Sequence, residues 1–373
     1  MSSRKKSGLS ISSETREIDT VVAIKDKNNV NAYYIINYSD NGFCILSADN
    51  RAYPVLAYSD ETKFSFEDGS EAITGWLLDA KENIEAIRTV PFTVRPIGEK
   101  KLQGVSKTMA YPYDPPEIIN PVSEQIEYHA PLVMTRWNQG TGYNNLAPNF
   151  VCTGSGSPSN GRAWAGCVAT AIGQIAAYHQ HPSSYNWASM PNLTGSAETS
   201  RLLRDIGDAV EMDWGCDGSG TNGGTKTVLG FNMLGYTMSK REFEAFTSSD
   251  PTDYFMAEIR NDRPFLISGG RQGNFLIFNY YKNGHEWVCD GFDRYKYSYT
   301  EVIQVDFDTW IYNDVVTYPT YFHMNWGWGG QHDGWFRIGE FAPTVENYRD
   351  TYRDDFPGTY NYKNIMYYNI NPI

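Results

Sequence analysis

The sequence predicts an α+β protein of two domains. With 373 residues, the chain is too long for one ordinary hydrophobic core. Aromatic residues make up 15% of it and glycines number 33, a composition that favours strands joined by many turns. In the second half a helical pattern comes first and strand-like runs follow, which is an α+β order.

The first domain is expected to be a small antiparallel sheet packed on a helix, roughly over residues 15–100. Strand-like runs at residues 32–36 and 43–46 flank Asp40, Asn41 and Gly42. Asn-Gly between two such runs indicates a hairpin. Residues 52–58 form a further strand-like run.

A helix is expected over residues 70–88 of this domain. Apolar residues recur there at helical spacing, and Ser70 is placed to cap the first turn. The apolar positions are Ile73, Trp76, Leu77, Ala80, Ile84 and Ile87.

Residues 104–130 separate the two domains. Prolines stand at positions 112, 115, 116 and 121 among polar residues, without a clear period. Such segments are typical of exposed linkers, which are preferred sites of proteolytic cleavage.

The second domain, residues 131–373, opens with a loop rich in Asn, Gly and Pro. A strong helix follows over residues 168–179, with one face lined by Val168, Ala171, Ile172, Ile175 and His179. Beyond about residue 225 the pattern predicts short, aromatic-rich strands, and no internal repeat is found.

Charge and hydropathy exclude several functions. Lys and Arg total 31 against 44 Asp and Glu, a net charge of -13 without a basic stripe, so nucleic acid is not an expected partner. No run of about 18 apolar residues exists to span a membrane. A basic start, Ser-Arg-Lys-Lys, is followed by polar residues rather than the apolar run of a signal peptide, which leaves open a cytoplasmic protein or a removed signal.

Five cysteines are too few for a disulfide framework, and no CxxC pair suggests a metal site. Cys44 and Cys289 lie in apolar strand-like runs and are expected in the core. Cys152 and Cys216 lie in loops, and the sequence leaves open whether they pair.

Cys167 stands directly before the helix of residues 168–179 and after Gly166. At a helix N-terminus, unpaired N–H groups and the macrodipole favour a thiolate, so a lowered thiol pKa and a nucleophilic role are predicted. The glycine would allow a substrate to approach the backbone closely. The alternative is a small residue at a helix start without a chemical role.

A nucleophilic cysteine needs a base, and the chain has six histidines. His179 and His181 lie at the far end of the helix, about 18 Å from Cys167 at 1.5 Å per residue. His285 opens the strand-like run 285–291, where a rigid strand would hold a catalytic base. The alternative for His285 is an edge residue that faces solvent.

Two further segments supply groups that such a pair would use. In the turn of residues 325–330, an Asn325 amide oxygen can accept an imidazole N–H and Trp326 can shield that bond. Gln139 carries a side-chain N–H that can stabilise an oxyanion. Alone, the Gly/Trp turn is typical of packing.

Other sites are excluded by their spacing. Asp213, Asp217 and Gly218 resemble the start of a calcium loop, but its twelfth position is Gly224 rather than an acidic ligand. No phosphate-binding glycine motif is present. We therefore expect neither a cofactor nor a metal.

Taken together, the second domain resembles the streptopain family, peptidase family C10, of bacterial cysteine proteases. The blocks around Cys167 and Asn325 are the specific ones, and the others support them in the family's order. The resemblance rests on Trp137-Asn138-Gln139, Tyr143-Asn144, Gly166-Cys167-Val168-Ala169-Thr170-Ala171, Tyr178-His179, Met212-Asp213-Trp214-Gly215, Gly284-His285-Glu286-Trp287-Val288-Cys289-Asp290-Gly291 and His323-Met324-Asn325-Trp326-Gly327-Trp328-Gly329-Gly330.

The first domain resembles the inhibitory propeptide of the same family. The similar segments are Gly42-Phe43-Cys44-Ile45-Leu46-Ser47-Ala48-Asp49 and Pro54-Val55-Leu56-Ala57-Tyr58-Ser59. The resemblance implies an inhibitory prodomain (1–103), a linker cut on activation (104–130) and a papain-like catalytic domain of two subdomains (131–373). It also implies an exported enzyme, in the medium or the cell envelope of a bacterium.

By position, the resemblance implies Cys167 as nucleophile and His285 as general base. Gln139 and the Cys167 backbone N–H would form the oxyanion hole, and Asn325 and Trp326 would orient and shield the histidine. The expected partners are protein or peptide substrates and the chain's own prodomain. We expect a monomer that cleaves peptide bonds through a thioester acyl-enzyme.

Two features depart from the family pattern. Glu286 follows the histidine where a small residue is expected, which predicts a raised imidazole pKa or an altered subsite. Residues 286–322 form a longer connection than a simple hairpin, which predicts a loop or strand pair over the cleft. Two other functions stay open: a protease-like binding protein without activity, and an amidase that acts on cell-wall peptides.

Overall fold

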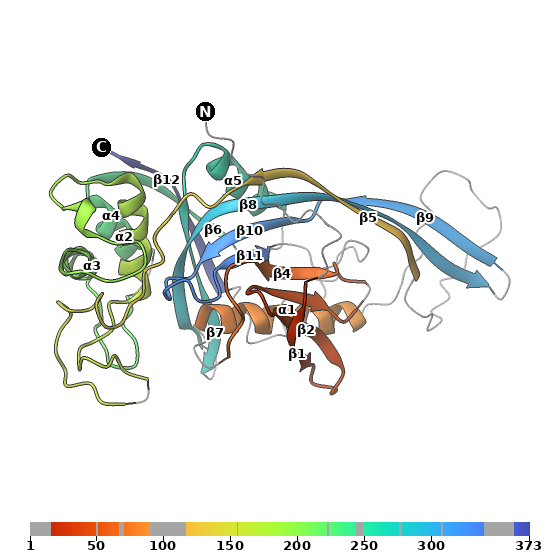
Figure 1. Cartoon of the computed structure of the whole chain (residues 1–373), viewed down its shortest axis with the longest axis horizontal. Helices are drawn as coiled ribbons and strands as arrows, with labels where there is room; N and C mark the ends of the chain where they lie inside the picture. Colours follow the sequence, from red (N-terminus) through yellow and green to blue (C-terminus); the bar gives the residue numbers. More distant parts are fainter. Residues whose placement is uncertain are drawn as a thin grey trace.

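Figure 1 shows the computed structural model of the chain, a large antiparallel sheet with helices gathered mainly at one end. The structure describes residues 16–49, 51–66, 71–89, 117–154, 156–221, 224–243, 249–275, 278–306, 309–338 and 362–373. The α+β prediction is confirmed.

The strands and helices follow in this order: β1 Ile18–Lys25, β2 Asn31–Tyr38, β3 Phe43–Ser47, β4 Val55–Ser59, α1 Glu71–Thr89, β5 Glu117–His129, α2 Cys167–His179, a 3-10 turn Trp187–Ser189, α3 Ala197–Ala209, α4 Thr225–Met233, β6 Tyr236–Phe243, α5 Ser249–Arg260, β7 Phe265–Phe275, β8 Phe278–Asp306, β9 Thr309–Thr317, β10 Thr320–Asn325, β11 Gly334–Arg337 and β12 Tyr362–Pro372.

The N-terminal unit has the predicted sheet and helix. β2 and β3 form the hairpin around Asn41 and Gly42, and β4 extends it. α1 buries Ile73, Ala80 and Ile84 against this sheet, as its helical spacing predicts. The predicted cap, Ser70, lies outside the described residues.

One sheet joins the N-terminal unit to the second domain. The strand order is β1-β2-β3-β4-β11-β10-β8-β7-β12-β6, and β5 and β9 both pair with β8. β4 pairs antiparallel with β11, where Trp335 lies opposite Tyr58 and Phe336 opposite Ala57. One hydrophobic core therefore includes Phe43 of β3 together with Phe336 of β11.

The helices α2, α3 and α4 lie together at one end of the sheet (Figure 1) and enclose a second core. The prediction of only short strands after residue 225 is wrong, because α4, α5 and the long strand β8 lie there. α4 contains a weak helix former, Gly230, in its interior. A Cβ at Gly230 would lie only 2.7 Å from the Ile172 side chain, so packing on α2 requires the glycine.

Part of the predicted linker is a strand. Residues 117–129 form β5, which pairs with β8 over residues 292–302, although much of β5 is exposed. The expectation of an irregular segment is therefore wrong for these residues. Residues 104–116 lie outside the described part of the chain.

The long connection after His285 forms a strand pair, as one of the two predicted possibilities. β8 continues to Asp306 and turns back along β9. Figure 1 shows this hairpin projecting from the end of the sheet opposite α2, the helix that begins at Cys167, so the predicted position over the cleft is wrong. Within the described residues, no helix is long and apolar enough to cross a membrane.

Candidate active site

Cys167 is the first residue of α2, as predicted. Gly166 precedes it with φ 90°, and a Cβ there would lie 2.9 Å from the Met212 sulfur and 3.1 Å from the Ser219 carbonyl oxygen. Glycine is therefore required at this turn. The Cys167 thiol is partly buried at the edge of the second core.

The pKa of the Cys167 thiol is raised to about 12, mainly by burial and then by the charge of Glu286. Hydrogen bonds from the backbone N–H groups of Glu286, Val168 and Cys167 act in the opposite direction. The predicted lowering of this pKa is wrong for the uncleaved chain, because burial and a neighbouring carboxylate outweigh the helix N-terminus. The thiol is therefore held protonated at neutral pH.

His285 lies on β8 opposite Gly269 of β7, with only 6% of its surface exposed. Its Nε2 lies 2.9 Å from the Trp326 carbonyl oxygen, so the neutral ring donates its Nε2–H there. Burial lowers the imidazole pKa to about 4, which contradicts the increase expected from the neighbouring glutamate.

The His285 side chain shares a face of the sheet with Trp287, and the two rings stack with centroids 6.1 Å apart. Glu286 and Val288 occupy the other face, which packs on α2 and α4. In the uncleaved chain, Glu286 is therefore the residue whose charge acts on the Cys167 thiol. The structure brings the strand of His285 to Cys167 but turns the imidazole away from the thiol.

Glu286 is a buried carboxyl group, only 2% exposed. One of its oxygens accepts a hydrogen bond from the Thr227 hydroxyl of α4 at 3.0 Å, whereas no group in the described part of the chain donates to the other. Burial raises its pKa to about 8. The carboxyl therefore changes from neutral to anionic in mildly alkaline solution, beside the thiol.

Replacing Glu286 with glutamine is expected to increase the alkylation rate of Cys167 by iodoacetamide in the uncleaved chain. The gain should reach about tenfold near pH 9.5, because an adjacent carboxylate raises a thiol pKa by about one unit. It should vanish near pH 6, where a carboxyl group with a pKa of about 8 is already neutral.

Peptide mapping of the alkylated cysteines measures this rate. Thr227→Val is the matched control, because it removes the hydrogen bond to Glu286 and keeps the charge. An alkylation rate that rises equally at both pH values, or at neither, would contradict the electrostatic account.

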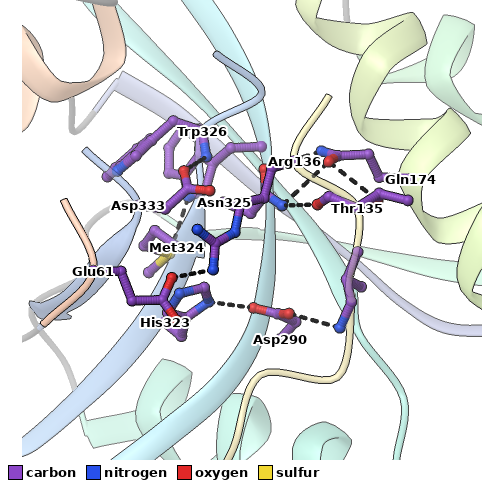
Figure 2. Close-up of polar contacts among 12 residues, drawn as sticks. Glu61, Thr135, Arg136, Gln174, Asp290, His323, Met324, Asn325, Trp326 and Asp333 are labelled. Carbon is purple, nitrogen blue, oxygen red and sulfur yellow. Dashed lines mark hydrogen bonds and ion pairs between the residues drawn. The ribbon is translucent and has the colours of Figure 1, made fainter. Parts of the chain in front are cut away.

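Asn325 is held away from His285. Its amide pairs reciprocally with Gln174 of α2 at 3.1 Å in each direction, and it also donates to the Thr135 carbonyl oxygen at 2.7 Å (Figure 2). The expected Asn325–His285 hydrogen bond is therefore not formed in the uncleaved chain. Gln174, which the sequence analysis missed, lies seven residues after Cys167 and was detectable as a polar side chain in an otherwise apolar helix.

Trp326 and Gln139 meet at the same turn. The Trp326 carbonyl holds His285, and its ring packs 5.1 Å from the Trp287 ring. The Gln139 side chain donates from Nε2 to the Gly327 carbonyl at 3.3 Å, and the Gln139 backbone carbonyl accepts the Ala165 N–H at 2.9 Å. Gln139 is thereby placed beside the chain that enters α2.

A disulfide joins Cys152 and Cys216, a pairing that the sequence left open. It links the two loops that flank Trp164, whose ring N–H donates to the Cys216 carbonyl at 2.9 Å. Cys289 is buried as expected, while Cys44 is partly buried. In the described residues, no three His, Cys, Asp or Glu side chains are grouped to hold a metal ion.

Comparison with known proteins covers both parts of the chain. Residues 137–336 match the model of the peptidase C10 family, and residues 2–84 match that of the Spi protease inhibitor. The C10 match includes all five predicted site residues: Gln139, Cys167, His285, Asn325 and Trp326.

The chain is 26% identical to streptopain of Streptococcus pyogenes, in an alignment that covers 84% of this chain and 75% of streptopain. It is 24% identical to the thiol protease/hemagglutinin PrtT of Porphyromonas gingivalis, over 90% of this chain and 37% of that protein. A solved fragment of Prevotella intermedia prointerpain A has the same fold, with a TM-score of 0.56 and 19% identity over 93% of this chain and 97% of the fragment.

Proposed function

The chain belongs to the peptidase C10 family of cysteine peptidases, and from this premise we propose that it is the zymogen of an exported endopeptidase. Cys167 is its nucleophile and His285 its general base. The observation that carries the proposal is the position of Cys167 at the N-terminus of α2, within the matched region and beside the strand of His285.

The reaction divides into two acyl transfers. His285 takes the thiol proton, and the Cys167 sulfur adds to the substrate carbonyl. The oxyanion accepts hydrogen bonds from the Gln139 Nε2–H and the Cys167 backbone N–H. His285 then protonates the departing amine as the peptide C–N bond breaks, which leaves a thioester. Water, deprotonated by His285, attacks the thioester and releases the acid and the thiol.

In the active enzyme, His285 must turn from the Trp326 carbonyl toward Cys167. Asn325 must then accept the second ring N–H, so its contacts with Gln174 are exchanged. The N-terminal unit is the element that supports the inactive arrangement. It contributes Phe43 and Phe64 to the core that surrounds Trp326 and Phe336.

The contacts between the two domains support inhibition within one chain. β4 continues the catalytic sheet at β11, the Ser59 hydroxyl donates to the Asp333 carbonyl at 2.8 Å, and Arg136 forms an ion pair with Glu61. The activation cut is placed in residues 104–130. Because β5 is paired with β8 from Glu117 onward, we expect the cut before this strand.

Export is supported by the disulfide between Cys152 and Cys216, because disulfides persist in oxidising compartments. The family resemblance also favours an apolar side chain at the second substrate position before the cut. Protein substrates are favoured over cell-wall peptides by the inhibitor-like prodomain.

The full-length chain is expected to shed its N-terminal unit and then degrade casein. The measurement is intact mass over time, with casein digestion followed in parallel. The control is the same chain, activated without denaturant and then alkylated at its thiols. This control should no longer digest casein. A chain that is cut by trypsin in residues 104–116 and still leaves casein intact would contradict the proposal.

A further inference from the structure

Asp290, His323 and Asp333 form a buried charged cluster beside the proposed catalytic groups (Figure 2). Their exposed fractions are 0%, 9% and 3%. Buried charges are costly unless they are paired, so a cluster of this kind needs a structural or chemical reason. None of the three takes part in the two acyl transfers.

Asp290 is the extra residue of a β-bulge in β8. Gly291 pairs with His323 of β10 and Cys289 pairs with Met324, so Asp290 has no opposite residue. The bulge follows directly on the paired segment in which Asn325 lies opposite Val288, three residues after His285, so it sets the register of that segment. Bulges re-aim the residues around them, which makes the register at Asp290 decisive for both catalytic segments.

The Asp290 carboxylate fixes this bulge with two contacts. Oδ1 accepts a hydrogen bond from His323 Nδ1 at 2.6 Å, and Oδ2 accepts the Val133 N–H at 2.8 Å. The Asp290 carbonyl also accepts the Leu132 N–H at 3.0 Å. Asp290 thereby joins β8 and β10 to the segment that leads to Gln139.

Asp333 extends the cluster to the turn after β10. Its carboxylate accepts the Trp326 N–H at 2.9 Å, and the Trp326 carbonyl holds His285. Thr135, two residues beyond Val133, accepts the Asn325 amide. The cluster therefore connects to each segment that carries a proposed catalytic group, except the start of α2.

His323 is the basic member of the cluster and lies directly against Asp290. Burial opposes its protonation, but the charge and hydrogen bond of Asp290, helped by Asp333, raise the imidazole pKa overall. The same imidazolium opposes the increase that burial causes in the pKa of Asp333. A protonated His323 therefore favours the ionised form of Asp333.

We propose that His323 is a positioning residue of the active site, which through Asp290 and Asp333 fixes the register of β8 against β10 and the turn at Trp326. This inference rests on the proposed peptidase function. His323 touches no substrate atom and acts through Asn325, Trp326 and the segment that leads to Gln139.

The test compares His323→Leu and His323→Asn, each alone and combined with Asn325→Ala. The full-length variants are processed by a trace of wild-type enzyme, and kcat is expressed per active site titrated with a thiol-directed epoxide. His323→Leu should lower kcat about 100-fold with little change in KM, as expected for misplaced catalytic groups. His323→Asn keeps a hydrogen-bond donor at the position of Nδ1 and should retain most of the wild-type kcat.

Coupling separates positioning from loss of stability. If His323 acts through the Asn325 turn, adding His323→Leu to Asn325→Ala should cost less than about threefold. Should the leucine variant give no titratable sites, the asparagine variant is carried through the same cycle. Any of three results would overturn the inference. They are losses in kcat that are fully additive between His323→Leu and Asn325→Ala, an unchanged kcat per active site in His323→Leu, or equal losses in the leucine and asparagine variants.

His179→Leu is the matched control, a partly buried histidine at the far end of α2. This variant should show the same number of active sites in the epoxide titration, and the same kcat, as the wild type. A wild-type chain without titratable sites would contradict the proposed function itself, whereas an active wild type with an unaffected His323→Leu variant would contradict only the positioning role.

Discussion

Replacing Cys167 with alanine is expected to abolish both self-processing and casein hydrolysis, by about 10⁴-fold or more. The loss is this large because the thiol is the group that forms the covalent intermediate, and the remaining oxyanion hole supplies only a fraction of the rate enhancement. The alanine fits the space of the partly buried thiol at the start of α2, so the fold should persist.

Intact mass over time, with the alanine variant beside the wild type, measures the effect. Cys44→Ala is the matched control, since Cys44 is another partly buried free thiol, on β3. The control should process like the wild type. Self-processing of the Cys167→Ala chain at a measurable rate would rule out Cys167 as nucleophile.

Replacing His285 with alanine should lower kcat of the processed enzyme by about 10³- to 10⁴-fold. A general base is needed to take the proton of the Cys167 thiol and to protonate the departing amine. In the uncleaved chain, the variant leaves the buried Trp326 carbonyl without this hydrogen bond, at a cost of about 1–3 kcal/mol.

The measurement is the steady-state rate on a peptide substrate after processing by a trace of wild-type enzyme. His181→Ala, beyond the end of α2, is the control and should remain active. If the His285→Ala enzyme keeps more than about a tenth of the wild-type kcat, another group is the base.

The helix that begins at Cys167 could be predicted because the signal is local. Gly166, Cys167 and the apolar period that follows define a helix start whatever the rest of the chain does. The hairpin around Gly42 was equally clear, since Asn-Gly between two strand-like runs specifies both the turn and the register.

Features that depend on pairing between distant segments were not predictable. The pairing of β4 with β11 and of β5 with β8 joins residues far apart in sequence, and no local pattern encodes either partner. The prolines before Glu117 suggested an irregular linker, although the alternation that follows is compatible with a strand at the sheet edge.

The orientation of His285 in the uncleaved chain could not be predicted. The sequence placed it on a strand but did not say which face it occupies in the uncleaved chain. Side chains alternate along a strand, so His285 shares a face with Trp287 and Glu286 lies on the face of Cys167. The raised pKa of the thiol follows from this alternation together with the packing of Glu286 on α4. The sequence indicated that Glu286 is unusual, but its charge was expected to act on the pKa of the His285 imidazole rather than on that of the Cys167 thiol.

The account is tested most directly by mapping which cysteine a thiol-directed epoxide labels before and after processing. It predicts slow labelling in the uncleaved chain, where the thiol is protonated and His285 is turned away, and rapid labelling of Cys167 alone after the N-terminal unit is removed. Cys44 and Cys289, the other free thiols, serve as internal controls within the same digest. A processed, folded chain in which Cys167 stays unlabelled, or is labelled no faster than before processing, would contradict it.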